Sequence, residues 1–248
     1  MITFEIKNQI GILKLNRPEK RNALHPNLIS QMKEKLSEIS DDDSVKALII
    51  TGEGKAFCAG ADLSYLNKLR NNSTIENEKD TEELADLFLK IYQFPKPTIA
   101  AVNGAAIAGG CGLASVCDLV VADENHSKFG YSEVKIGFLP AIVSIFVIKR
   151  IGEGSARQML LTGEVINGKR AYEVGFVNYL YNNVLNGAIE VCSNIIKNYP
   201  DSLKDTKAMI DAVSNLRVED AVNYCIRLNT ISRSTEEFQN GLESFFNK

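Results

Sequence analysis

The chain has 248 residues, of which 45% are hydrophobic and 24% are charged, and its formal net charge is −3. This composition is that of an ordinary globular protein, and it excludes collagen-like, disordered and disulfide-scaffold classes. Acidic and basic side chains are interspersed, so we expect no nucleic-acid partner and no anionic membrane surface. The length allows one large domain, or a core that carries a smaller appendage.

The cysteines indicate the compartment. The chain has five, an odd number, and no CxxC pair occurs among Cys58, Cys111, Cys117, Cys192 and Cys225. In a chain of this length that pattern predicts reduced thiols in a reducing compartment. The first residues show no apolar signal segment, and no apolar run approaches membrane-spanning length. We therefore expect a soluble, cytoplasmic protein.

The first half of the sequence alternates strands and helices. Residues 2–7 and 10–15 alternate around Asn8-Gln9, which predicts a hairpin. A continuous apolar run at 45–51 predicts a strand covered on both faces. The polar stretch 67–80 predicts a mobile loop or a frayed helix. The other elements expected here are helices at 26–39 and 81–94, strands at 98–102 and 119–122, and a helix from the glycine-rich segment to about Cys117.

From Gly152 onward the pattern is helical. The order of strands and helices with glycine-rich turns indicates parallel βαβ units. We therefore predict an α/β core over residues 1–190 and a helical C-terminal subdomain over residues 191–248. The helices expected after Gly152 lie at 155–161, 168–174, 184–198, 202–215, 217–231 and 234–246.

Two segments of small residues have the pattern of backbone binding sites. One is Ala59-Gly60-Ala61-Asp62 and the other is Gly109-Gly110, and each follows a strand where a helix begins. Small side chains leave backbone N–H groups uncovered, and helix N-termini add partial positive charge. Two such amides that converge make an oxyanion hole, which suits a thioester enolate. The alternative, that the small residues only allow close helix packing, stays open from spacing alone.

Glu133 is the candidate acid or base. Its neighbours in Phe129-Gly130-Tyr131-Ser132-Glu133-Val134 are largely apolar or aromatic. A carboxyl group in such surroundings has a raised pKa, which suits general acid–base catalysis. A surface glutamate on a turn is the alternative, and the sequence does not decide between the two.

Other catalytic classes fit less well. His25 and His126 are the two histidines, and neither lies in a ligand-spaced cluster, so we expect no metal site. The G-x-S-x-G nucleophile elbow is absent, and the glycines match neither a Walker loop nor a dinucleotide fingerprint. Cys111 and Cys117 are expected to be small buried thiols rather than nucleophiles.

Together, the motifs resemble the enoyl-CoA hydratase/isomerase (crotonase) family over nearly the whole chain. The resemblance implies a crotonase-like spiral of ββα units with a C-terminal helical trimerisation region, assembled as a homotrimer or a dimer of trimers. The matching segments are Asn16-Arg17-Pro18 with Asn22-Ala23-Leu24, Ala56-Phe57-Cys58-Ala59-Gly60-Ala61-Asp62-Leu63, Ala101-Val102-Asn103-Gly104 with Gly109-Gly110-Cys111-Gly112, Phe129-Gly130 with Glu133, and Gly137 with Pro140.

The resemblance also implies residue roles. Ala61 and Gly109 would supply the oxyanion amides. Coenzyme A, as part of the acyl-CoA substrate and not as a separate cofactor, would be held by residues of two loops and by a basic residue near the C-terminus. Those residues are Arg21, Ala23, Ala59, Asp62, Leu63 and Lys248. Asp62 is expected to cap the following helix rather than join the chemistry.

One position departs from the family pattern. Typical hydratases of the family carry a second glutamate three residues after the second oxyanion glycine, and this chain has Gly112 there. Glu133 would then act alone, with a water or a backbone group near Gly112. The segment from Glu133 to Val143 is similar to bacterial hydratases assigned to 3-methylglutaconyl-CoA in leucine breakdown, although it lacks the glycine pair common after the proline.

Three functions follow from this departure. The favoured one is an enoyl-CoA hydratase that adds water across the 2,3 double bond with one glutamate, with 3-methylglutaconyl-CoA as a candidate substrate. The second is a Δ3,Δ2-enoyl-CoA isomerase in which Glu133 shuttles a proton between carbons. The third is an acyl-thioester decarboxylase or a non-catalytic CoA-binding homologue, and the intact amide pair with Glu133 argues against a pure binder.

Overall fold

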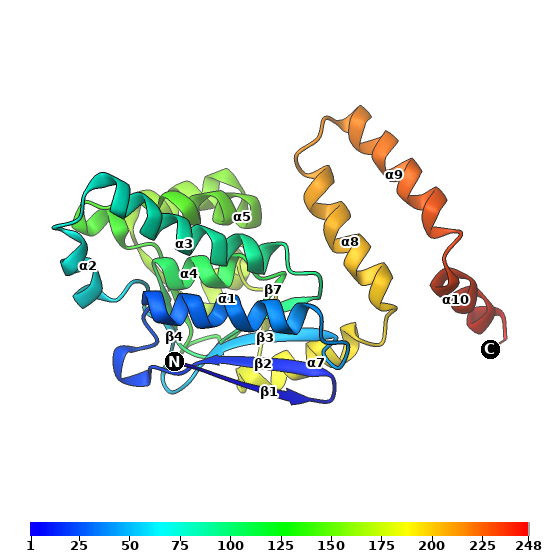
Figure 1. The fold of residues 1–248 in the computed structure, drawn as a ribbon, viewed down its shortest axis with the longest axis horizontal. Helices are drawn as coiled ribbons and strands as arrows, with labels where there is room; N and C mark the ends of the chain where they lie inside the picture. Colours follow the sequence, from blue (N-terminus) through cyan, green and yellow to red (C-terminus); the bar gives the residue numbers. More distant parts are fainter. Residues whose placement is uncertain (248) are drawn as a thin grey trace.

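The chain builds two sheets with helices packed around them (Figure 1). The computed structural model describes residues 1–247, so Lys248 lies outside the described residues. The larger sheet has the order β1 (Ile2–Lys7), β2 (Ile10–Leu15), β3 (Ala47–Gly52), β5 (Thr98–Val102), β7 (Leu119–Ala122) and β10 (Tyr179–Leu180). The smaller sheet has the order β4 (Ala56–Cys58), β6 (Ala105–Ile107), β8 (Lys128–Gly130) and β9 (Val165–Asn167).

Most neighbouring strands are parallel. The exceptions are β1 with β2 and β8 with β9, which are antiparallel. The predicted hairpin is confirmed: its turn residues Asn8 and Gln9 have φ values of 50° and 64°, the left-handed conformation that a tight hairpin turn requires. The parallel order β2-β3-β5-β7 confirms the expected parallel βαβ arrangement.

A single unit recurs along the chain. A strand of the larger sheet is followed by a strand of the smaller sheet and then by a helical segment. β3 and β4 lead to α2 (Leu63–Leu69), β5 and β6 lead to α4 (Gly109–Ser115), and β7 and β8 lead to the 3₁₀ helix η2 (Glu133–Ile136). The predicted α/β fold of ββα units is therefore confirmed.

Both faces of the larger sheet are covered, which explains its continuous apolar strands. In β3, Leu48 and Ile50 belong to the main core, whereas Ala47 and Ile49 pack with α7 (Val184–Ile195) on the opposite face. The helices α1 (Pro26–Ser40), α3 (Thr74–Tyr92), α4 and α5 (Ala141–Thr162) lie on the main-core side (Figure 1). The boundary predicted between residues 190 and 191 falls inside α7.

Two helices begin earlier than the sequence predicts. α3 starts at Thr74, inside the stretch 67–80 that was expected to be a loop or a frayed helix. Ser73 and Glu76 form a reciprocal capping box there, which satisfies two otherwise free N–H groups of the helix start. α5 starts at Ala141 rather than after Gly152, and Gly152, with φ 74°, marks a kink inside it.

The last three helices project from the body of the protein (Figure 1). These are α8 (Pro200–Val213), α9 (Val218–Ser232) and α10 (Glu236–Phe246), and none of them has a buried residue within the described part of the chain. α8 is held to the core by polar contacts: Lys207 Nζ lies 2.8 Å from Asp118 Oδ2, and the Tyr92 hydroxyl donates to Asp211 Oδ1 at 2.8 Å. Within residues 1–247 no helix is both long and apolar enough to cross a membrane.

Candidate active site

The predicted catalytic groups stand at the carboxyl ends of three adjacent parallel strands. β6 lies between β4 and β8 in the smaller sheet. Ala61 comes three residues after the end of β4, Gly109 two residues after the end of β6, and Glu133 three residues after the end of β8. Neighbouring strands are about 4.8 Å apart, so the fold itself gathers these segments at one edge with Gly109 in the middle. Ligands of parallel sheets bind at this kind of edge.

The two loops with the predicted oxyanion amides touch each other. A methyl group added at Gly60, whose φ is 88°, would lie 2.9 Å from Ile107 O, 3.0 Å from Ala108 Cβ and 3.6 Å from Gly109 N. Gly60 therefore has to be glycine for its conformation and for this close approach. The contact brings the backbone just before Ala61 against the start of α4.

Both amides are free to bind a ligand. Among residues 1–247, neither Ala61 N nor Gly109 N donates a hydrogen bond, and both residues are partly exposed. Ala108, the residue before Gly109, has φ 52° and ψ −124°, a strained conformation for a residue with a side chain. It is held by the bond from its own N–H to Gly130 O at 2.8 Å and from Gly112 N to its carbonyl at 3.0 Å. The ψ angle of Ala108 determines how the following peptide, which carries the N–H of Gly109, is oriented.

The predicted CoA-binding residues form a second group on two paired loops. Ala59 N donates to Arg21 O at 3.0 Å, Leu24 N donates to Gly60 O at 2.7 Å, and Asp62 N donates to Leu24 O at 2.8 Å. Backbone hydrogen bonds therefore join residues 21–24 to residues 59–62 next to the amide of Ala61. Arg21 is exposed with φ 50°, Ala23 is buried, and Leu63 is 74% exposed at the first turn of α2.

A buried ion pair fixes these loops, and no role was predicted for its cation, Arg17, from the sequence. Arg17 Nη2 lies 2.9 Å from Asp62 Oδ2, and Arg17 Nη1 donates to Ala23 O at 2.7 Å. Asn22 accepts from Arg17 N at 2.9 Å and donates to Ala56 O at 2.8 Å. The short motifs around Arg17 and Asn22 could have indicated this role, since each combines a buried polar group with a turn.

Asp62 is a helix cap, as predicted. Its Oδ1 accepts from Ser64 N at 3.0 Å and from the Ser64 hydroxyl, while its Oδ2 pairs with Arg17. The hydrogen bond from the Ser64 hydroxyl, followed by that from Arg17, holds the pKa of the Asp62 carboxyl well below its usual range. The group is a permanent anion and has no proton to exchange near neutral pH.

Glu133 has the opposite environment. It is 8% exposed, and its buried Oε2 has no hydrogen-bond partner within residues 1–247. Burial raises the pKa of the Glu133 carboxyl above its ordinary value, and a backbone hydrogen bond within the residue offsets part of this rise. An unpaired buried carboxyl is costly for stability and is typical of a group kept for a reaction.

Gly112 faces an apolar wall. A methyl group at this position would overlap Val143 Cγ1 and would lie 3.1 Å from Phe88 Cε2. Val143 is 5% exposed and Phe88 is completely buried. The space that a side chain at residue 112 would need is therefore occupied by α5 and α3. Both residues lie in segments, 63–90 and 138–146, that were expected to contribute to the acyl pocket, and their contact with Gly112 is visible only in the fold.

The cysteine thiols near this region are protonated, and therefore weak nucleophiles, near neutral pH. Desolvation raises the pKa of Cys111 and of Cys117 to about 12 in each case, so neither is a thiolate near neutral pH. This agrees with the prediction of small buried thiols. Within the described residues, no cluster of three or more histidine, cysteine, aspartate or glutamate side chains could hold a metal ion.

Comparisons with known proteins agree with this geometry. The pattern of the enoyl-CoA hydratase/isomerase family matches residues 5–248. A Thermus thermophilus protein assigned as an enoyl-CoA hydratase is 39% identical, covering 98% of this chain and 96% of the relative. A Clostridium acetobutylicum short-chain-enoyl-CoA hydratase is 31% identical, covering 100% and 95%. The crystal structure of an enoyl-CoA hydratase from Shewanella pealeana superposes with a TM-score of 0.94 at 29% identity, covering 99% and 93%.

The fold, the paired amide loops and the family match define the class of protein. The chain belongs to the enoyl-CoA hydratase/isomerase family.

Proposed function

We propose that the protein is an enoyl-CoA hydratase that adds water across the 2,3 double bond of a 2-enoyl-CoA thioester. The observation that carries the proposal is the pair of free amides, Ala61 N and Gly109 N, on two loops in contact, with the unpaired carboxyl of Glu133 after the next strand. In the proposed complex the thioester carbonyl accepts hydrogen bonds from both amides. This polarises the conjugated double bond and stabilises the enolate that forms when oxygen adds at the β-carbon.

Glu133 moves the proton in this mechanism. Its ionised carboxyl takes a proton from the attacking water, the water oxygen bonds to the β-carbon, and the electron pair of the double bond moves onto the thioester oxygen. The enolate then collapses as the α-carbon takes the proton from Glu133, so one carboxyl group serves first as base and then as acid. The raised pKa suits this double role, because a group with a pKa nearer neutrality exchanges protons readily in both directions.

The second candidate function is a Δ3,Δ2-enoyl-CoA isomerase. The observation that favours it is the apolar wall of Val143 and Phe88 at Gly112, which leaves no space there for a second acidic side chain. An isomerase needs only one carboxyl group, which removes the α-proton and returns it to the γ-carbon, and it needs no bound water. Both functions use the same amides and the same enolate.

One assay separates the two functions. The purified protein is incubated in heavy-oxygen water with crotonyl-CoA, 3-methylglutaconyl-CoA and a 3-enoyl-CoA in separate reactions, and the products are read by mass spectrometry. Hydration predicts a gain of one labelled water by a 2-enoyl substrate. Migration of the double bond in the 3-enoyl substrate without uptake of label would instead establish an isomerase. Preference for 3-methylglutaconyl-CoA would support the proposed place in leucine breakdown.

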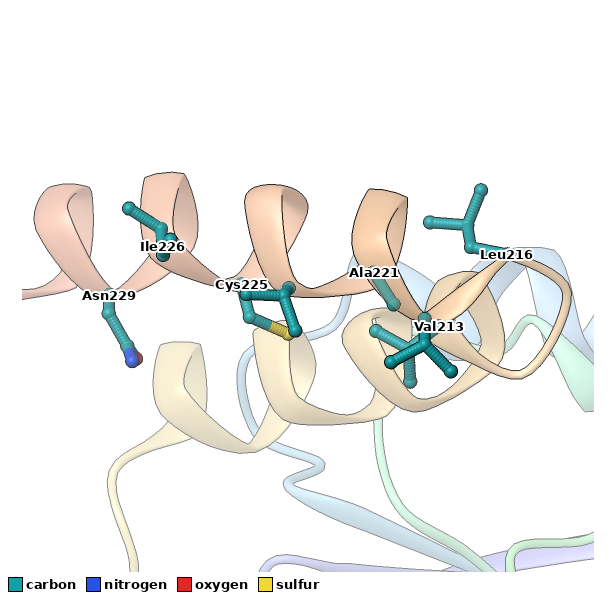
Figure 2. A pocket seen from close by; sticks show the side chains of 8 residues that line it. Val213, Leu216, Ala221, Cys225, Ile226 and Asn229 are labelled. Carbon is teal, nitrogen blue, oxygen red and sulfur yellow. The ribbon is translucent and has the colours of Figure 1, made fainter.

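The projecting helices support an oligomer. One face of α9, with Val213 at the end of α8 and Leu216 in the connection, lines an open groove of about 380 Å³ that is mainly apolar (Figure 2). Val218 is 75% exposed and Ile226 58% exposed, and Phe245 on α10 is 73% exposed. Exposed apolar surface of this extent marks interaction sites. We propose that these helices pack against further copies of the chain in a trimer or a dimer of trimers. Light scattering tests this, and a clean monomer would contradict it.

The cysteines bear on the compartment. All five are free thiols, and four of them are buried. Free thiols are maintained where the surroundings are reducing, so we propose that the enzyme works in the cytoplasm. Fractionation of cells that express the native chain would test this, and recovery of the protein with a secreted or membrane fraction would contradict it.

A further inference from the structure

Helix α4, which begins with the proposed oxyanion amide of Gly109, depends on the rest of the protein for its shape. It has seven residues, Gly109–Ser115, and three of them are glycine. A helix of this length is unstable in water on its own, and glycine is, apart from proline, the residue least favourable to a helix. The direction of the Gly109 N–H is therefore set by contacts that other segments make with α4.

The first turn of α4 is held by close packing. A methyl group added at Gly110 would overlap Cys58 O, so the backbone of α4 lies directly against the end of β4. Gly112 N donates to Ala108 O at 3.0 Å, which closes the first turn around the peptide between Ala108 and Gly109. Both contacts act on the beginning of α4, and other groups have to hold its end.

A cation from α5 holds the last turn of α4. The last four carbonyl groups of a helix have no partner within its regular bonding, and in α4 each of them accepts a hydrogen bond. Three have donors in α4 or in the turn after it, whereas Ser115 O accepts from Arg150 Nε at 3.2 Å. The local bonds run from Ser115 Oγ to Gly112 O at 2.7 Å, from Cys117 Sγ to Leu113 O at 3.6 Å, and from Cys117 N to Ala114 O at 3.3 Å.

The guanidinium group of Arg150 joins this turn to two further segments. Nη2 donates to Cys117 O and, at 3.4 Å, to Asp118 O, in the turn from α4 to β7. Nη1 donates to Phe176 O at 3.4 Å and to Asn178 Oδ1 at 3.5 Å, just before β10. The guanidinium carbon lies 5.8 Å from the centre of the Phe176 ring. One side chain thus fixes the end of α4 relative to two strands of the larger sheet.

We propose that Arg150 is a positioning residue for the reaction: by holding the end of α4, it keeps the Gly109 N–H directed at the thioester oxygen. This rests on the proposed function, because it takes Gly109 N as an oxyanion donor. α4 rises about 9 Å from Gly109 to Ser115 at 1.5 Å per residue, so Arg150 acts through the helix and not on the substrate. A tilt of α4 about the contact of Gly110 with Cys58 would turn the N–H away, and such a donor stabilises an oxyanion only when it points at it.

The kinetic test uses two substitutions of Arg150 and one matched control. Arg150→Lys keeps the positive charge, but its three donors on a single nitrogen cannot reproduce the planar fork. Arg150→Gln removes the charge as well. We expect kcat and kcat/KM for crotonyl-CoA to fall together, by about 10-fold in Arg150→Lys and up to about 10²-fold in Arg150→Gln, since a misdirected donor loses part of its contribution. Arg157→Lys makes the same change on α5 at a side chain that is 68% exposed, and it should keep wild-type kinetics.

Infrared spectroscopy separates positioning from a loss of stability, and Arg150→Lys carries this test if Arg150→Gln does not fold. The ligand is butyryl-CoA labelled with carbon-13 at the thioester carbonyl, whose stretching frequency falls when its oxygen accepts hydrogen bonds. We expect the wild type to lower this frequency on binding and Arg150→Lys to lose part of the shift. Met159→Ala truncates a core side chain of α5 that is 2% exposed, so it should lower Tm and keep the full shift. An Arg150→Lys variant with a lower Tm but the wild-type shift and kcat would overturn the proposal.

The infrared measurement needs no turnover, so it also separates this inference from the proposed reaction. If the wild type hydrates no 2-enoyl-CoA but its carbonyl shift is reduced in Arg150→Lys, the positioning role is correct and the hydratase is wrong. If hydration is observed and Arg150→Lys keeps the full shift, the hydratase stands and the positioning role is wrong. A wild-type spectrum without any shift would overturn the oxyanion amides on which both rest.

Discussion

Two carboxyl groups of this protein are buried to nearly the same extent and have opposite surroundings. Asp62 is 5% exposed and Glu133 is 8% exposed. Asp62 accepts hydrogen bonds from Ser64 and pairs with Arg17, whereas Oε2 of Glu133 has no partner in the described chain. Their pKa values accordingly shift in opposite directions, below the ordinary value for Asp62 and above it for Glu133.

The contrast shows that burial alone does not assign a role to an acid. Asp62 holds the loops that carry Ala61 and the predicted CoA contacts. Its negative charge is neutralised by the ion pair with Arg17. Glu133 follows β8, at the edge where Ala61 and Gly109 lie, and its Oε2 has no hydrogen-bond partner among residues 1–247. A carboxylate paired with a cation, such as Asp62, stabilises the fold, whereas a carboxyl group without a partner, such as Glu133, can interact with a substrate.

Removal of the unpaired carboxyl should have the largest effect on turnover. We expect Glu133→Gln to lower kcat by about 10² to 10⁴-fold, the usual contribution of a general acid or base, with little change in acyl-CoA affinity. Steady-state kinetics on the preferred 2-enoyl-CoA measures the first quantity and calorimetry the second. Near-wild-type turnover would remove Glu133 from the role.

Removal of the paired carboxyl should instead destabilise the fold. Asp62→Asn leaves the Arg17 guanidinium buried without its counter-ion, which typically costs about 3 to 5 kcal/mol. Urea unfolding measures the loss, and kcat of the folded fraction should fall less than 10-fold. The control is Glu124→Gln, which breaks the exposed Glu124–Lys169 pair at 3.8 Å and should change stability by less than about 0.5 kcal/mol. Equal losses in the two variants would break the comparison.

A substitution by proline removes the backbone N–H of Gly109, one of the two predicted oxyanion donors, without altering Ala61 or Glu133. Gly109 is the first residue of α4, a position where proline is tolerated and its missing N–H leaves no helical bond unmade. We expect Gly109→Pro to lower kcat by about 10² to 10³-fold. Gly109→Ala keeps the N–H, and its methyl group would meet only the tip of Leu24 at 3.1 Å, so it should retain most activity. Circular dichroism verifies that both variants fold.

The smallest effect concerns the pH dependence of stability. Glu133 has a raised folded-state pKa, so the native state holds its proton after the unfolded state has lost it. Native stability therefore falls as pH rises from about 4.3, the unfolded value, to the folded-state pKa. Glu133→Gln removes this loss, so its Tm should exceed that of the wild type above this pH window and should converge with it below pH 4. A lower Tm at neutral pH would contradict the unpaired state of Oε2.

Asp62 gives the opposite sign. Its folded-state pKa is depressed, so its stabilising contribution is present above the unfolded value of about 3.9 and is lost as pH falls below it. The difference in stability between wild type and Asp62→Asn should therefore be largest near neutral pH and should shrink in acid. Thermal melts across the same pH series supply this comparison.

The sequence predicts elements that have strong periodicity or continuous apolar runs. The hairpin at Asn8-Gln9, the helix over residues 26–39 and the strands at 98–102 and 119–122 all form as expected. The start of α5 was missed because Ala141-Ile142-Val143-Ser144-Ile145-Phe146 is rich in β-branched residues, a composition that periodicity cannot separate from a strand. The strands β4, β6, β8 and β9 have three residues each, too few for a pattern.

The sequence predicted the candidate site residues but not the contacts that position them. Ala61, Gly109 and Glu133 follow strands of one small sheet, and that sheet is visible only in the fold. The strain at Ala108 and the contact of Val143 with Gly112 depend on segments distant in the chain, so no local pattern encodes them. The roles of Ala61, Gly109, Glu133 and the CoA-binding residues stay predictions. The predicted contact of Lys248 with CoA lies outside the described residues.

The most direct test of the account follows proton transfer itself. Butyryl-CoA in deuterated water is incubated with wild-type protein, Glu133→Gln and Asp62→Asn, and NMR monitors replacement of the α-hydrogens by deuterium. This exchange requires an enolate held by the amides and a base at the α-carbon, whichever overall reaction the enzyme performs. We predict exchange with the wild type and with folded Asp62→Asn, and a rate at least about 10²-fold lower with Glu133→Gln. Exchange by Glu133→Gln at the wild-type rate would show that another group moves the proton.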